Sequence, residues 1–255
     1  MSTAPVFLTE RLPDGEFAVL DGPEGHHAAT VRRLRAGESL VLTDGAGTSA
    51  SCVIENVERD RLELRITERV RSVPARPRVT VAQALVKGDR GELAVELATE
   101  AGADAIVPWR ANRCVARWDE GPRGAKALAK WRSTVTSAAK QARRSWVPEV
   151  AEPVNTRGLA DLAAEMDLAL VLHESASRPL TELDLTEAGE VLLIVGPEGG
   201  IDDGERDRLT AAGAAEIRLG PQVLRASTAA AVALGALGAL TSRWSGSAGG
   251  DRIAT

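Results

Sequence analysis

Runs of apolar residues in the second half of the chain constrain its fold most strongly. Leu168–Leu172 and Val191–Val195 are wholly apolar, Glu216–Leu219 is nearly so, and helical stretches separate or follow them. A strand that is apolar on both faces has to be covered on both faces, which is typical of parallel sheets in α/β proteins. These runs predict that the second half of the chain forms a parallel α/β domain.

Two further strands and two helices extend this pattern toward the N-terminus. Val79–Leu85 and Ala105–Trp109 have the composition of strands. Between them, Leu93, Leu97 and Ala101 recur every four residues and predict a helix. A long helix is expected over residues 123–144, with Trp131, Val135, Ala139 and Ala142 on one side.

The first 72 residues have a different pattern. Short apolar runs separated by turns containing Gly and Asp predict strands at 17–20, 39–43, 50–54 and 61–66, with a short helix over 24–34. This indicates a small barrel or sandwich. Pro74 and Pro77 resist both helix and central strand, so a linker is expected before the α/β domain. The expected division is a β domain over 1–72, a linker over 73–77, an α/β domain over 78–244 and a flexible tail over 245–255.

The charge of the chain is unevenly distributed. The net charge is −5, which by itself argues against a nucleic-acid partner. Between Arg110 and Trp146, however, ten Lys or Arg residues face only two acids, Asp119 and Glu120. This segment suits a phosphate backbone, although charge alone also fits a solvated helix face.

Cysteines and terminal segments bear on compartment and on metal binding. Cys52 and Cys114 are far apart and lack the spacing of a zinc site or a disulfide framework, so no metal is expected. Residues 1–5 lack the features of a signal peptide, and the uncharged run Ala226–Leu240 is too short to span a bilayer. We expect a cytoplasmic protein without a membrane partner.

Two glycine–proline turns carry the main functional signal. The strand ending at Val195 runs into Gly196–Gly200, and Asp202 with Glu205 has the spacing of a capping box. A second Gly-Pro, at Gly220, follows the strand near Leu219. A strand, a glycine turn and a helix N-terminus together are typical of ligand sites in α/β sheets, although either turn alone also fits a plain tight turn. The sequence contains neither a P-loop nor a dinucleotide-binding fingerprint.

The joint spacing of these turns resembles a known family. Gly196–Gly200 followed by Leu219–Arg225 is similar to the signature of the methyltransferases that modify N3 of a uridine in small-subunit (16S) ribosomal RNA. The resemblance runs over roughly residues 5–243 in the same order. Further matching positions are Lys87, Asn112-Arg113, Trp131, 138–144, 147–149, 26–28 and 31–34.

The resemblance implies a fold, a cofactor and an assembly. The implied fold is a C-terminal SPOUT domain with a trefoil knot and a parallel sheet, preceded by a PUA-like β-barrel that binds RNA. The implied cofactor is S-adenosyl-L-methionine (SAM), the implied partner is small-subunit ribosomal RNA, and two subunits pair as a homodimer. The residues implied to bind SAM are Leu172, His173, Glu174, Gly196, Glu198, Gly199, Gly200, Leu219, Gly220, Val223, Leu224 and Ser227.

Catalytic roles are expected for Arg225, Glu198 and Ser227. We hypothesise that Arg225 stabilises negative charge on the uracil edge as the N3 proton leaves. The alternative is that Arg225 pairs with Glu198 or caps a helix end. The family often has Glu-Thr-Ala after the Leu-Arg pair, whereas this chain has Ser227 in place of the Glu, so that Glu's role does not carry over. His173, near the expected slot, fits a structural role as well as a chemical one.

RNA contacts are expected from basic residues of both domains. They are Arg11, His27, Arg32, Arg33, Lys87, Arg113, Lys140, Arg143 and Arg144. The target base has to be unpaired or flipped to expose N3. Three other functions remain open: a SPOUT enzyme acting on another RNA, such as tRNA or a ribose 2′-oxygen, a non-catalytic RNA-binding or ribosome-assembly module, and an α/β enzyme for a small molecule.

Overall fold

The computed structural model describes residues 4–245, which form two compact units. Residues 4–74 and 139–147 form the N-terminal unit, and residues 75–138 and 148–245 form the C-terminal unit. The tail expected over 245–255 lies outside the described residues except for Ser245.

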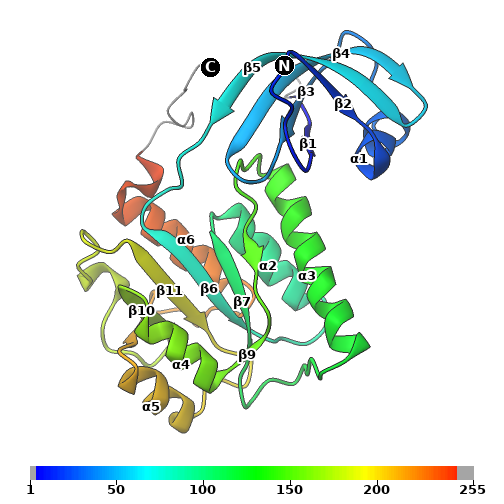
Figure 1. Cartoon of the computed structure of the whole chain (residues 1–255). Coiled ribbons are helices and arrows are strands. Elements are labelled where there is room, and N and C mark those ends of the chain that lie inside the picture. The colour runs from blue at the N-terminus through cyan, green and yellow to red at the C-terminus, as the bar shows by residue number, and fades with distance from the viewer. Residues whose placement is uncertain (1–3, 246–255) are drawn as a thin grey trace. The chain divides into compact units, whose positions relative to one another are not determined.

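The N-terminal unit is built on a five-stranded sheet with the order β1-β3-β4-β5-β2 (Figure 1). Its strands are β1 (Val6–Leu8), β2 (Phe17–Leu20), β3 (Ser39–Thr43), β4 (Thr48–Glu58) and β5 (Arg61–Arg71). All neighbours are antiparallel except β1 and β3. Alternate residues such as Leu40, Leu42, Leu62 and Leu64 are buried in one core, as strand periodicity requires.

The helix expected over 24–34 is not one continuous α-helix. α1 covers Gly22–His26, and a π-helical turn, η1, covers His27–Val31. Gly25 is packed so closely that an added Cβ would lie 2.2 Å from the Asp60 carbonyl oxygen. Arg33 then takes φ +55°, which ends the helical path before Leu34.

The C-terminal unit contains a parallel sheet with the order β12-β10-β11-β6-β7-β8, and β9 also pairs with β7. Its strands are β6 (Arg78–Ala84), β7 (Ala105–Arg110), β8 (Glu149–Val150), β9 (Val154–Asn155), β10 (Leu168–Leu172), β11 (Glu190–Val195) and β12 (Ala215–Ile217). The predicted parallel α/β domain is therefore confirmed. The threading of the chain through a knot stays a prediction.

Helices cover both faces of this sheet (Figure 1). α2 (Arg90–Glu100) and α6 (Ala229–Leu240) contact each other and β6, while α4 (Thr156–Ala164) and α5 (Asp203–Ala211) contact each other on the opposite face. The remaining helical segments are α3 (Pro122–Gln141), η2 (Leu180–Glu182) and η3 (Ser242–Trp244). No helix among residues 4–245 is long and apolar enough to cross a membrane.

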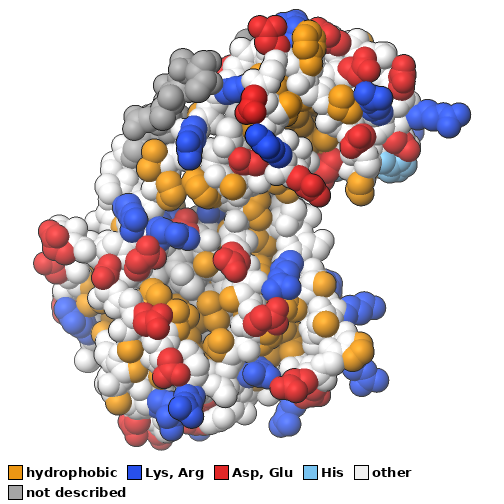
Figure 2. All heavy atoms as spheres, in the orientation of Figure 1, with side chains coloured by type: hydrophobic (Ala, Val, Ile, Leu, Met, Phe, Trp, Pro, Cys, Tyr) orange, Lys and Arg blue, Asp and Glu red, His pale blue; other side chains and the backbone are white. Residues whose placement is uncertain are grey.

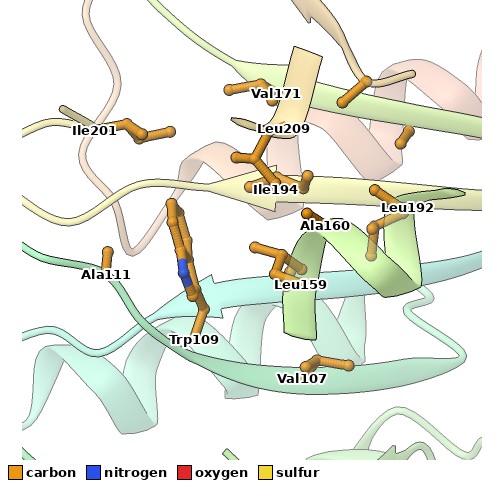
Figure 3. Close-up of a cluster of buried hydrophobic side chains, with 14 of the residues drawn as sticks. Val107, Trp109, Ala111, Leu159, Ala160, Val171, Leu192, Ile194, Ile201 and Leu209 are labelled. Carbon is orange, nitrogen blue, oxygen red and sulfur yellow. The ribbon is translucent and has the colours of Figure 1, made fainter. Parts of the chain in front are cut away.

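One core cluster joins α4 and α5 to the sheet. Leu159 of α4 and Leu209 of α5 are fully buried against Leu192 and Ile194 of β11. Figure 3 shows Trp109 standing up from β7 beside Leu159. Its indole Nε1 donates to Thr156 Oγ1 at 3.3 Å, so the ring keeps a polar partner although it is fully buried.

Several element boundaries differ from those predicted, and β4 and β5 run on to Glu58 and Arg71 rather than ending at residues 54 and 66. α3 ends at Gln141 rather than at residue 144, because Arg143 takes φ +55° and its amide bonds back to Lys140 O. β12 ends at Ile217 rather than at 219, because the Arg218 amide donates to Arg178 O, outside the sheet.

Candidate active site

A pocket of ≈ 330 Å³ opens at the carboxyl ends of β10 and β11. Ligand sites of parallel sheets lie at this edge, where successive loops diverge. The lining residues are Val86, Arg90, Leu172, His173, Glu174, Val195, Gly196, Pro197, Glu198, Gly200, Ile201, Val223, Leu224, Arg225, Ala226, Ser227 and Ala229. A smaller recess of ≈ 60 Å³ shares several of these residues and adds Leu219 and Gly220.

The turn after β11 shapes one wall of the pocket. Gly200 takes φ +75°, which favours glycine, and its amide donates to Pro197 O at 2.9 Å. Ile201 folds over Gly196 so closely that an added Cβ there would lie 2.6 Å from Ile201 Cγ1. The predicted capping box then starts α5, since Asp202 accepts from the Glu205 amide and the Glu205 side chain accepts from the Asp202 amide.

The loop between β12 and α6 forms the opposite wall. The Arg225 carbonyl accepts from the amides of Thr228 and Ala229 at 2.9 and 3.0 Å, and this turn leads into α6. Ser227 is buried, with 4% of its surface exposed, and lines the pocket. The Arg225 side chain is exposed and also lines the pocket. Arg225 therefore contacts the start of α6 through its backbone carbonyl rather than through its guanidinium.

Groups of both charges face the pocket. Arg90, the first residue of α2, lies with Nη1 3.9 Å from Glu198 Oε1. Glu198 therefore has Arg90 rather than Arg225 as its ion-pair partner in this structure. Glu174 and Arg225 add one charge of each sign to the lining. The His173 ring accepts from the Ser175 amide through Nδ1 at 3.2 Å.

The loop after β7 is fastened beside this pocket. Asn112 Nδ2 donates to Asp202 Oδ2 at 2.7 Å, and the pKa of Asp202 is lowered chiefly by this bond and then by that from the Glu205 amide. Arg113 Nη1 donates to Gly199 O at 3.3 Å. In the same loop Cys114 is partly buried, and burial raises the pKa of its thiol.

Most of the residues expected to bind the cofactor lie together. All of them line the pocket or the adjoining recess except Gly199, which lies within the turn between two lining residues. The lining residues that sequence analysis missed include Val86, Arg90, Val195, Ile201 and Ala229. Arg90 lies three residues after Lys87, which was expected to contact RNA, and it is the first residue of α2. Its position at the start of a helix is the signal that could have identified it.

The basic residues expected to contact RNA differ in exposure and in their partners. Arg11, Arg32, Arg33, Lys87, Arg113 and Arg143 are exposed. Lys140 is paired instead, donating to both Glu24 carboxylate oxygens at 2.6 and 2.7 Å, with its ammonium 5.5 Å from the centre of the Phe7 ring. His27 packs edge-on against the same ring at 5.8 Å. Basic and acidic side chains are interspersed on the face shown in Figure 2.

Both units match known protein families. Residues 74–238 match the RNA methyltransferase domain family, and residues 20–67 match the RNA methyltransferase PUA domain family. These two matches place the chain in the class of RNA methyltransferases with a PUA domain, and the parallel α/β unit with a pocket at its carboxyl edge is consistent with that class.

Similarity to individual proteins shows which family within this class the chain belongs to. The chain is 54% identical over 250 residues to ribosomal RNA small subunit methyltransferase E of Mycobacterium tuberculosis, covering 96% of this chain and 95% of the relative. It is 29% identical over 228 residues to the protein of the same name from Bacillus subtilis, covering 86% of this chain and 88% of that one. The chain belongs to the ribosomal RNA small subunit methyltransferase E family.

Solved structures agree with this assignment. A methyltransferase from Legionella pneumophila, in complex with the cofactor SAM, has a TM-score of 0.84 and 29% identity, covering 93% of this chain and 98% of that one. Ribosomal RNA small subunit methyltransferase E from Neisseria gonorrhoeae, bound to S-adenosyl methionine, has a TM-score of 0.82 and 27% identity, with the same coverage.

Proposed function

We propose that this protein transfers a methyl group from SAM to N3 of a uridine in small-subunit (16S) ribosomal RNA, acting as a homodimer. The observation that carries the proposal is the convergence of Glu174, the Gly196–Gly200 turn and the Val223–Ser227 loop on one pocket. The relatives named above act, by name, on small-subunit ribosomal RNA. The PUA unit and the exposed arginines of both units give RNA a surface to contact.

The pocket suits SAM in size and in charge. Its volume of ≈ 330 Å³ lies in the range typical of cofactor sites, about 300–1,000 Å³. SAM carries a carboxylate, an ammonium and a sulfonium, and the lining offers Arg90 as well as Glu174 and Glu198. The glycines of the turn let the backbone come close to a flat ligand such as adenine.

When bound, SAM supplies an electrophilic methyl group. The protein then has to hold the uracil N3 in line with that group and to stabilise the charge that develops as the N3 proton leaves. Arg225, with an exposed guanidinium at the pocket, stabilises negative charge on the O2–N3–O4 edge. Ser227 lines the pocket and offers its hydroxyl as a hydrogen-bond donor to the bound cofactor or base, and Glu198 pairs with Arg90.

His173 is poorly arranged to remove the N3 proton. Its Nδ1 accepts from the Ser175 amide, so the neutral ring carries its proton on Nε2. A ring in that form has no free lone pair at Nε2 to receive another proton. Lowering the pKa of N3 through Arg225, with release of the proton to water, therefore accounts better for the reaction than a histidine base.

The test is transfer of labelled methyl from SAM to small ribosomal subunits that lack the endogenous modification, with free 16S rRNA and tRNA alongside. Nucleoside analysis should find the label as 3-methyluridine in the ribosomal RNA. Arg225→Ala should lower the transfer rate by about 10²–10³-fold with SAM affinity kept, while Arg208→Ala, on the exposed side of α5, should not.

Other outcomes would contradict separate parts of the proposal. Label in another nucleoside or in tRNA would reject the target. Full activity of a folded Arg225→Ala variant would reject the role of Arg225. Absence of SAM binding would favour a non-catalytic RNA-binding module.

A further inference from the structure

Glu205 is a buried carboxylate whose contacts go beyond its capping box. It lies in the first turn of α5 with 2% of its surface exposed. Its Oε2 accepts from the Asp202 amide at 3.4 Å, which completes the cap. Its Oε1 accepts from two groups far away in the sequence, the Asn112 amide at 2.9 Å and Thr156 Oγ1 at 2.6 Å. Burying a carboxylate costs free energy unless hydrogen bonds satisfy its oxygens, and these three bonds offset that cost.

These bonds fix the backbone of the loop after β7. Thr156, the first residue of α4, also accepts from the Trp109 indole at 3.3 Å, and this indole is fully buried in the core. Asn112 makes two hydrogen bonds: its backbone N–H donates to Glu205, and its side-chain Nδ2 donates to Asp202. These hydrogen bonds join the start of the loop to α4 and α5. Glu205 and Trp109, two members of the network, are buried.

The next residue, Arg113, lies against the pocket turn. Its Nη1 donates to Gly199 O, and an added Cβ on Gly199 would lie 3.2 Å from Arg113 Cβ. Gly200, the following residue, lines the pocket, and the Arg113 side chain is exposed. The guanidinium is therefore placed at the rim of the pocket, with donors left over for a ligand outside it.

We propose that Glu205 is a positioning residue for RNA binding, which acts by holding Arg113 at the pocket rim, where its guanidinium contacts a phosphate of the RNA. The inference rests on the proposed function for the identity of the ligand. An exposed guanidinium with a fixed backbone suits phosphate, because its fork of donors matches phosphate oxygens and less entropy is lost on binding. Contacts to phosphates set the register of the nucleic acid, here relative to the pocket.

Two variants weaken the network at different points. In Glu205→Gln the amide nitrogen would face the Asp202 amide, so one acceptor becomes a donor. Thr156→Val keeps the capping box and removes one hydroxyl, which donates to Glu205 and accepts from the Trp109 indole, so it tests the same idea if the first variant folds poorly. Each should weaken binding of end-labelled 16S rRNA by about tenfold. Asp203→Asn removes an exposed carboxylate from the same helical turn and should leave binding unchanged.

A double-mutant cycle with Arg113→Ala separates positioning from a general structural effect. If Glu205 acts through Arg113, then Glu205→Gln and Thr156→Val should weaken RNA binding no further in the Arg113→Ala background. SAM affinity, measured by calorimetry, should stay within about twofold, because the turn keeps its own bond between Gly200 and Pro197.

Additive losses of RNA affinity, unchanged RNA affinity in the single variants, or an equal loss of SAM affinity would each overturn the inference. These readouts need no methyl transfer. A wild-type protein that binds RNA with this coupling but makes no 3-methyluridine would reject the proposed reaction and leave the positioning role standing.

Discussion

At the end of β11, Gly196 leaves the space that the Ile201 side chain fills. Ile201 is buried and lines the pocket, so this one contact links the packing of the core to the shape of the site. A methyl group at Gly196 would have to displace a branched side chain that packs into the core cluster. Overpacking of this kind costs about 1–3 kcal/mol.

Gly196→Ala is therefore expected to lower the free energy of unfolding by about 1–3 kcal/mol and to weaken SAM binding. Thermal unfolding and calorimetry measure the two effects. Gly204→Ala is the matched control, because its Cβ would only reach ordinary contact with Asp202 Oδ1 at 3.5 Å, and alanine favours α5. Equal behaviour of the two variants would mean that Ile201 moves aside without cost.

Lys140 illustrates how tertiary contacts change the meaning of a basic residue. In the sequence it belongs to a basic segment suited to RNA. In the structure only 17% of its side chain is exposed, and both oxygens of Glu24 accept from it. Its role as an RNA contact stays a prediction, and it would require Lys140 to exchange Glu24 for a phosphate.

At the scale of elements, an ion pair ties α5 to β12. Arg206 donates to both oxygens of Glu216 at 2.6 and 2.7 Å, so two parallel bonds hold the planar groups together. The pKa of Glu216 is lowered from 4.5, chiefly by the hydrogen bond from Arg206. A folded-state pKa below the unfolded one means that the stabilisation is complete above about pH 4.5 and is lost as the pH falls through the folded value.

Glu216→Gln should therefore lower the free energy of unfolding by about 1 kcal/mol at pH 7. The difference from wild type should shrink as the pH falls below about 4. Denaturant unfolding across this pH range measures it, with Glu165→Gln at the exposed end of α4 as the control. If the difference in free energy of unfolding between Glu216→Gln and wild type did not change with pH, the charge of Glu216 would not be the cause of the stabilisation.

At the scale of the whole molecule, exposed apolar residues on α6 support the proposed homodimer. Val232 and Leu240 are 45% and 47% exposed on a helix made otherwise of Ala, Gly, Val and Leu. Val223, in the loop that lines the pocket, is 76% exposed. Small residues let helices approach closely, so α6 offers a surface that a second copy can cover.

Light scattering on a sizing column should give the mass of two 26.8 kDa chains for the wild type. Val232→Glu combined with Leu240→Glu should shift the protein toward the monomer, because two charges would be buried without partners. Val73→Glu changes a similarly exposed residue of the N-terminal unit and should not. A monomeric wild type would reject the dimer.

Elements with a local residue pattern could be predicted from the sequence. The strands at 168–172 and 17–20 have the predicted bounds, because burial on one or both faces is recorded directly in the residue pattern. The capping box at Asp202 and Glu205 was predictable for the same reason, since its partners are three residues apart. The two glycine turns indicated the family and most of the pocket.

Contacts between groups far apart in the sequence could not be predicted in this way. Arg90 faces the pocket because α2 starts beside the turn that carries Glu198. Glu205 meets Asn112, 93 residues away, and Thr156, 49 residues away. Such pairs depend on strand order and on how helices pack over the sheet. Local periodicity encodes which side of an element is buried, but not what it is buried against.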